Sequence, residues 1–167
     1  TGNTYTGTSS GSLNGSGTQI NAGTLGMYGD GSLGVVPSGP YANIQFPGSA
    51  TLQDTANDIS LNVNRNITIA TGATATFDTN GHALTINGVI GSPGAVNVVK
   101  AGSGNLTVGS SSGGLANNST WTVQGGSYSS TTGLYDSVLA LAAGNVLGNA
   151  TGNLLNLNAG TLQFTAN

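Results

Sequence analysis

The chain has 167 residues, of which 37% are hydrophobic and only 4% are charged, with two Lys+Arg, five aspartates and a net charge of -3. So few cations provide no basic surface for nucleic acid, and the hydrophobic content with low net charge argues against intrinsic disorder. No apolar run reaches the length of about 18 residues that a membrane-spanning helix needs.

Alternation of apolar residues with Thr, Ser or Asn predicts short β-strands throughout the chain, because alternate side chains of a strand point to the same face. Gly- and Asn-rich turns separate these runs, since both residues tolerate positive φ. In chain order, the predicted strands centre on 59–63, 67–69, 75–77, 84–86, 96–98, 106–108, 121–123, 155–157 and 162–164.

Residues 136–148 (DSVLALAAGNVLG) are the best place for a helix in this sequence. Asp136 or Ser137 is a suitable N-cap, and Gly144 is a suitable stop. A short helical turn here is the alternative to a strand. The rest of the chain is predicted to be all-β.

An internal repeat relates residues 42–57 (ANIQFPGSATLQDTAN) to residues 152–167 (GNLLNLNAGTLQFTAN) without gaps. A shorter repeat relates INAGTL at 20–25 to LNAGTL at 157–162. Repeated strand–turn–strand units indicate a solenoid, in which each unit buries its apolar face on its neighbours. We therefore predict a single domain over 1–167, a parallel β-helix of roughly seven or eight coils whose ends are uncapped.

Two segments carry a resemblance to a known family. Residues 2–25, with a Tyr-Thr-Gly start and Asn-Ala-Gly-Thr-Leu end, resemble the β-strand repeat associated with bacterial autotransporter passenger domains. Residues 77–108 resemble the section that leads into the next repeat, although the stretch 9–14 is longer than the family's. The resemblance implies a right-handed β-helix that is secreted or displayed on a bacterial surface.

The ionisable residues predict neither a catalytic nor a metal site. Asp54 and Asp58 are spaced for one face of a strand, yet they sit in a loop-like stretch and are interpreted as a solvated turn. Asp78 is predicted to cap its own turn. His82 is the only histidine, which is too few for a zinc site or a serine hydrolase. The sequence GDGSLG at 29–34 is one incomplete copy of a calcium-binding repeat, so no cofactor is predicted.

Aromatic residues offer the only candidate contact surface. Trp121 alternates with Val123, which indicates a core position. Tyr128 and Tyr135 lie in GGSYSSTTGLYDS, the longest irregular stretch, and we predict that any ligand or contact surface includes these two rings.

Two hypotheses for function remain. The first is a non-enzymatic extracellular structural protein, a rod that serves as a filament subunit or as the stalk of an adhesin or surface fibre. Its partners would be copies of itself or glycans of a neighbouring cell, because uncapped solenoid ends leave backbone and core exposed. The second is a polysaccharide-binding or polysaccharide-degrading β-helix protein. The scarcity of acids favours the first.

Overall fold

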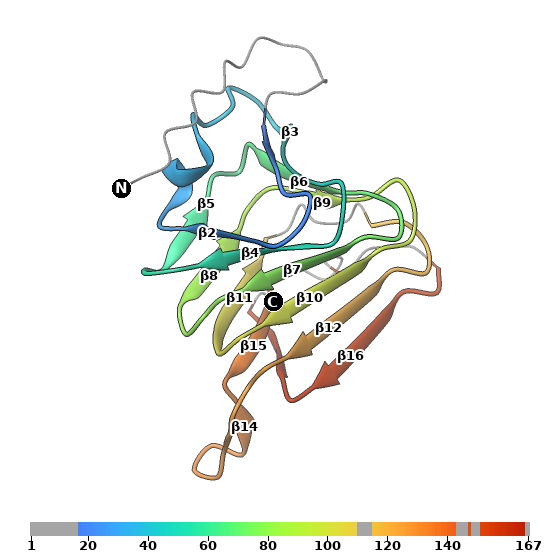
Figure 1. The fold of residues 1–167 in the computed structure, drawn as a ribbon. Helices are drawn as coiled ribbons and strands as arrows, with labels where there is room; N and C mark the ends of the chain where they lie inside the picture. Colours follow the sequence, from blue (N-terminus) through green and yellow to red (C-terminus); the bar gives the residue numbers. More distant parts are fainter. Residues whose placement is uncertain (1–16, 110–114, 143–146, 148–150, 166–167) are drawn as a thin grey trace.

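The computed structural model describes residues 17–109, 115–142, 147 and 151–165 (Figure 1). Over these residues three parallel sheets surround one hydrophobic core, and each strand pairs with strands from the turn before or the turn after. The chain therefore forms a β-solenoid of stacked turns. The predicted all-β parallel β-helix is confirmed.

Each sheet takes one strand from successive turns. Sheet A has the order β1 (Thr18–Gln19), β3 (Tyr41–Phe46), β6 (Arg65–Ile69) and β9 (Ile90–Gly91). Sheet B has the order β2 (Thr24–Met27), β4 (Ala50–Asp54), β7 (Thr74–Asp78), β10 (Asn97–Ala101), β12 (Thr120–Gln124) and β16 (Leu154–Asn158). Sheet C has the order β5 (Ile59–Leu61), β8 (Ala83–Ile86), β11 (Gly104–Val108), β15 (Ser137–Leu141) and β17 (Thr161–Phe164).

Two smaller elements complete the fold. A 3-10 helix, η1 (Asp30–Leu33), follows β2. The strands β13 (Tyr128–Ser129) and β14 (Leu134–Tyr135) form an antiparallel pair of their own between β12 and β15.

The length of one turn varies along the stack. Hydrogen bonds between neighbouring turns join residues that are 25 positions apart in sequence at Ser49 and Thr74, and 23 apart at Thr74 and Asn97. The separation grows to 34 between Ser119 and Asn153, because β13 and β14 are inserted in that turn. The longest sheet has six strands, so the described residues make about six turns, where seven or eight were predicted.

Inward-facing side chains form continuous columns through the stack, because strands of successive turns pair in register. One column of paired positions runs from Leu52 through Phe77, Lys100 and Val123 to Leu157. The rings of Phe46 and Phe77 meet edge to face at 5.7 Å between centroids. Trp121 is 1% exposed, which confirms the predicted core position.

The structure corrects two sequence-based expectations. Residues 137–141 form strand β15, so the helical alternative at the start of 136–148 is wrong; residues 143–146 and 148 of that stretch lie outside the described residues. Val63 was expected to share the buried face of Ile59 and Leu61, but β5 ends at Leu61 and Val63 is 58% exposed in the following turn.

Candidate functional site: an aromatic hairpin and an open end of the stack

The hairpin formed by β13 and β14 projects from the stack at the corner between sheets B and C (Figure 1). It brings together the two tyrosines that were predicted as a contact surface. Tyr128 pairs with Tyr135, and their rings meet edge to face at 5.5 Å between centroids. Tyr128 is 61% exposed, and Leu134 and Tyr135 are also exposed.

The hairpin is an insertion in a corner that the turns before and after it close with two residues, 102–103 between β10 and β11 and 159–160 between β16 and β17. Gly104 pairs with Ser137, and Lys100 pairs with Val123, so the corner residues Gly102 and Ser103 correspond to Gly125 and Asp136. Gly102 and Gly125 both have positive φ, at 72° and 84°. Residues 126–135 are therefore extra to the solenoid and present the aromatic pair to solvent.

Among the other tyrosines, Tyr28 and Tyr41 are exposed away from this hairpin, and Tyr5 lies outside the described residues. Exposed aromatic rings bind apolar faces of ligands, while the hydroxyl supplies a hydrogen bond. The neighbouring Ser127 and Ser129 are polar, and the exposed Asp136 at the base of the hairpin accepts a hydrogen bond from Ser127 N–H. Such a surface is chemically suited to stacking on the apolar face of a ligand that also carries hydrogen-bonding groups.

All five aspartates accept hydrogen bonds from groups of the chain itself. Asp54 accepts from the backbone N–H groups of Ala56 and Asn57, and Asp58 accepts from Ala83 N–H. Five hydrogen bonds reach the other three aspartates: Asn80 N–H and Gln53 Nε2 donate to Asp78, Ser127 N–H donates to Asp136, and Arg65 Nε and Asn62 N–H donate to Asp30.

These contacts settle the predicted turns. Asp78 caps its own turn as expected, with 2.9 Å from Asn80 N to Oδ1. Asp54 and Asp58 bound a turn, but Asp54 is fully buried and not solvated, because it shares the inward parity of Ala50 and Leu52. Its Oδ2 has no hydrogen-bond partner among the described residues. His82 is half-buried in the turn before β8, and the described residues contain no group of three metal-ligating side chains.

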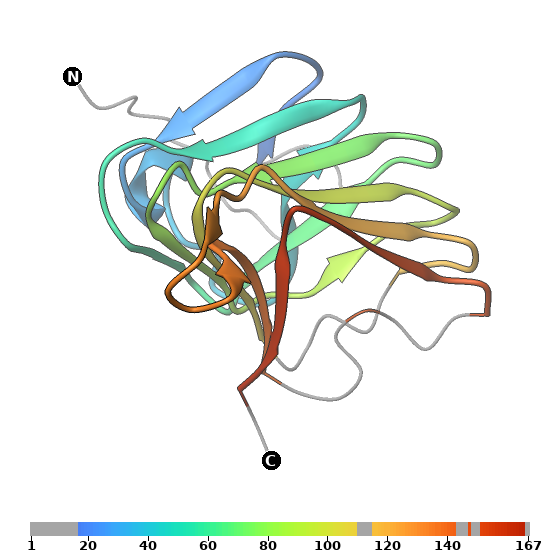
Figure 2. The ribbon, with the colours of Figure 1, turned by 90° about the horizontal axis from the view of Figure 1, so that it is seen from below.

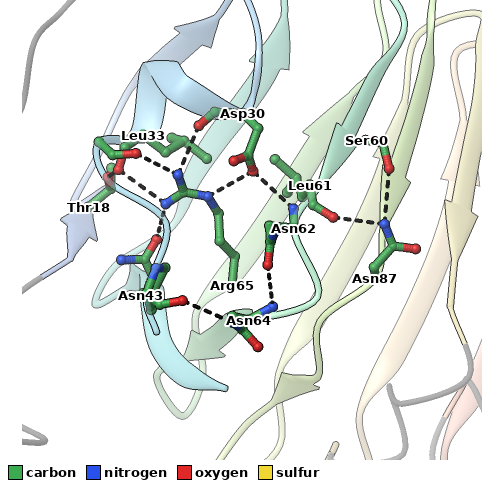
Figure 3. Close-up of polar contacts among 12 residues, drawn as sticks. Thr18, Asp30, Leu33, Asn43, Ser60, Leu61, Asn62, Asn64, Arg65 and Asn87 are labelled. Atoms are coloured by element: carbon green, nitrogen blue, oxygen red, sulfur yellow. Dashed lines mark hydrogen bonds and ion pairs between the residues drawn. The ribbon is translucent and has the colours of Figure 1, made fainter. Parts of the chain in front are cut away.

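Both cations of the chain are buried. Arg65 begins β6 and points inward, and its guanidinium binds five oxygens around η1 (Figure 3). Nε pairs with Asp30 Oδ1 at 2.8 Å, and Nη2 donates to Gly34 O at 2.6 Å. The remaining acceptors are Asp30 O, Leu33 O and Asn43 Oδ1.

Asn43 reaches Arg65 because a β-bulge interrupts β3. The register between β3 and β6 shifts between Ala42 and Ile44, so Asn43 and Ile44 are both buried. The bulge turns one extra side chain into the interior. Arg65 thereby connects η1, β3 and β6 in the first turns of the stack.

Lys100 lies in an otherwise apolar inward column and is fully buried. Its Nζ donates to Gly102 O at 2.6 Å, to Ala101 O at 3.0 Å and to Ser137 Oγ at 3.1 Å. Burial lowers the pKa of Lys100 to about 8, and the charges of Asp78 and Asp136 oppose that change. The ammonium thus connects the corner after β10 to Ser137, the first residue of β15, which follows the aromatic hairpin.

The last turn of the stack leaves the interior uncovered on one side. In the column from Val123 to Leu157, exposure rises from 0% to 48%, and from Leu141 to Phe164 it rises from 4% to 69%. Within the described sheets, β16 pairs only with β12 and β17 only with β15. In the first described turn, by contrast, Ile20, Met27 and Leu33 are buried. Figure 2 views the stack from the uncovered end.

Comparisons with other proteins give no family assignment. No protein-family model matches the chain, and neither the curated proteins nor the solved structures contain a significant match. In the described part of the chain no helix has the length and apolar character needed to cross a membrane.

Proposed function

We propose that the chain is a non-enzymatic structural protein, a β-solenoid rod that acts as a filament subunit or as the stalk of an adhesin or surface fibre. The observation that carries this proposal is the open end at β16 and β17. Inward-facing Leu157 and Phe164 are exposed there, beside strand edges that no other described strand pairs. Such an edge is a template for a further coil, supplied by a copy of the chain or by more of the same polypeptide.

The location of the rod is proposed to be the bacterial exterior. The resemblance of residues 2–25 and 77–108 to autotransporter-associated repeats supports a right-handed, secreted or surface-displayed β-helix. The absence of cysteine from the sequence suits an oxidising exterior, where free thiols cross-link.

A structural role is also supported by how the acids are used. General acid–base chemistry needs carboxyl groups that can reach a substrate and exchange protons. Here each of the five aspartates holds a turn, a strand edge or Arg65 through hydrogen bonds within the chain. We therefore expect no hydrolytic or lyase activity.

Self-association is tested by sedimentation velocity and electron microscopy of the purified chain over a range of concentrations. We expect the wild type to associate reversibly and Phe164→Asp to weaken association by about 10- to 100-fold, because burying one Phe is worth about 1.5–3 kcal/mol. Val63→Asp is the matched control, since Val63 is exposed in a side turn. A wild type that stays monomeric at every attainable concentration contradicts self-association at the open end, as does equal weakening by Val63→Asp.

The exposed ring pair of Tyr128 and Tyr135 favours polysaccharide binding as a second candidate function. Stacking of sugars on Tyr rings would slow the chain in gels that contain the right polysaccharide. Tyr128→Ala should remove that retardation, while Tyr28→Ala, at a similarly exposed tyrosine, should not. Release of reducing ends from the polysaccharide would indicate a degrading enzyme and contradict a purely structural role.

A further inference from the structure

The outer face of sheet B carries a ladder of threonines. The register places Thr24, Thr51, Thr76, Val99, Thr122 and Asn156 at equivalent outward positions of the six strands. Thr74 and Thr120 lie in the adjacent outward column, two residues earlier on β7 and β12. Two strands therefore present paired threonines, separated by one turn of the stack.

Spacing makes this array regular in two dimensions. Neighbouring strands of a sheet are about 4.8 Å apart, and alternate residues of a parallel strand are about 6.6 Å apart. Four consecutive positions of the ladder, from Thr51 to Thr122, hold β-branched side chains, and these have restricted χ1 rotamers. Val99 replaces one hydroxyl by a methyl without changing the shape much. The outer face is therefore a stiff grid of methyl and hydroxyl groups.

The ladder hydroxyls have no role in the described fold. Thr24, Thr51, Thr76 and Thr122 make no side-chain hydrogen bond with other described residues, whereas threonines at the corners bind backbone carbonyls. For example, Thr55 Oγ1 donates to Met27 O at 2.9 Å. The ladder side chains are half-buried or exposed and lie on the outer face of the sheet.

The face is almost uncharged. In the three outward columns of sheet B the only ionisable residue is Asp78, whose Oδ2 is occupied by Gln53 Nε2 at 2.7 Å. Charged groups hold hydration water in their own geometry, and a neutral face does not. A charged polymer therefore finds no complementary partner here.

We propose that the outer face of sheet B binds ice, with the threonine ladder as the binding surface. A rigid grid of hydroxyls bonds to water at fixed intervals, and the intervening methyl groups favour ordered water over mobile liquid water. Ice is a neutral crystalline ligand whose oxygens repeat on a lattice of comparable spacing. Because little side-chain motion has to be frozen on contact, adsorption costs little conformational entropy.

The test measures thermal hysteresis and inhibition of ice recrystallisation. The wild-type chain should open a gap between melting and freezing points and give facetted crystals. Thr76→Lys and Thr122→Lys should each remove most of that gap, because an ammonium in the middle of the ladder displaces the ice plane. Thr68→Lys is the matched control, since Thr68 is a half-buried outward residue of β6 in sheet A.

Circular dichroism melts of all four proteins identify a variant that fails to fold, and the remaining ladder variant then decides. The proposal is overturned if the wild type gives no larger gap than an equal mass of serum albumin, or if Thr68→Lys loses as much activity as the ladder variants. It is also overturned if the ladder variants abolish binding to an insoluble polysaccharide, or dimerisation, while the wild type has no effect on ice. The test is independent of self-association at the open end.

Discussion

Lys100 places a positive charge where its neighbours in the stack are Phe77 and Val123. A buried ammonium is stable only when it is well hydrogen-bonded, and Lys100 meets this need with two carbonyls and one hydroxyl. Gly102 makes this possible, because its positive φ of 72° sets the corner whose carbonyl binds Nζ. A Cβ at Gly102 would lie only 2.9 Å from the backbone N of Asn80, and φ is in the left-handed region, so this corner requires glycine.

The lowered pKa of Lys100 predicts an unusual dependence of stability on pH. The folded pKa is about 8 and the ordinary value is 10.5, so the unfolded chain binds more protons between these values and stability rises with pH. Between pH 7.5 and 9.5 we expect the free energy of unfolding in urea to increase by about 2 kcal/mol. Lys100→Met should remove the increase. A wild type whose stability is flat or falls over this range contradicts the prediction.

The buried positions of Arg65, Lys100 and Asp54 follow from strand parity. Arg65 shares parity with Ile67 and Ile69, and Lys100 with Val96 and Val98. Alternation therefore predicts that these charges point inward. The partners of Arg65 and Lys100 were not predictable, because Asp30 and Asn43 lie 35 and 22 residues from Arg65, and Ser137 lies 37 residues from Lys100. These residues meet only through the stacking of turns.

At the scale of elements, alternation predicted the central strands and glycine or asparagine predicted the corners. The prediction was wrong at Val63, because the strand ends before it and the residue lies in a turn. It was also wrong at 136–141, where a segment with a suitable helix N-cap forms a strand because it pairs with β11. The β13–β14 pair was predicted only as an irregular stretch. Antiparallel pairing of Tyr128 with Tyr135 has no periodic signal, because each strand has only two residues.

Removal of the aromatic hairpin should leave the solenoid intact. Deleting residues 126–135 joins Gly125 to Asp136 and recreates the two-residue corner of Gly102 and Ser103. The free energy of unfolding should change by no more than about 1 kcal/mol, since loop-closure entropy varies slowly with loop length. Urea denaturation of the deletion variant measures this. A variant that no longer folds would show that the hairpin is part of the core.

At the scale of the whole molecule, the two copies of the internal repeat occupy different sheets of the solenoid. Residues 42–57 cover β3 in sheet A and β4 in sheet B, while the matching residues 152–167 include β16 in sheet B and β17 in sheet C. The shorter repeat of INAGTL and LNAGTL is displaced in the same way. A strand–turn–strand unit is therefore interchangeable between two corners of the solenoid. The sequence predicted the stacking but could not fix which sheet each copy joins.

The same architecture predicts resistance to trypsin. The chain has only two sites, after Arg65 and Lys100, and both side chains are fully buried in strands that pair on both sides. Cleavage therefore requires the stack to open, and its rate should follow the population of the open form. In native buffer the chain should stay intact, and in urea it should give fragments 1–65, 66–100 and 101–167.

Chymotrypsin is the control, since it cuts after aromatic residues and Tyr128 and Tyr135 are exposed on the hairpin. It should nick the native chain between β12 and β15 while trypsin leaves the chain whole. Both proteases then act on the same folded protein, and only the position of their sites differs. Tryptic cleavage of the native chain as fast as that of the urea-unfolded chain would mean that β6 or β10 opens without global unfolding. Such opening is incompatible with a rod held together by continuous parallel ladders.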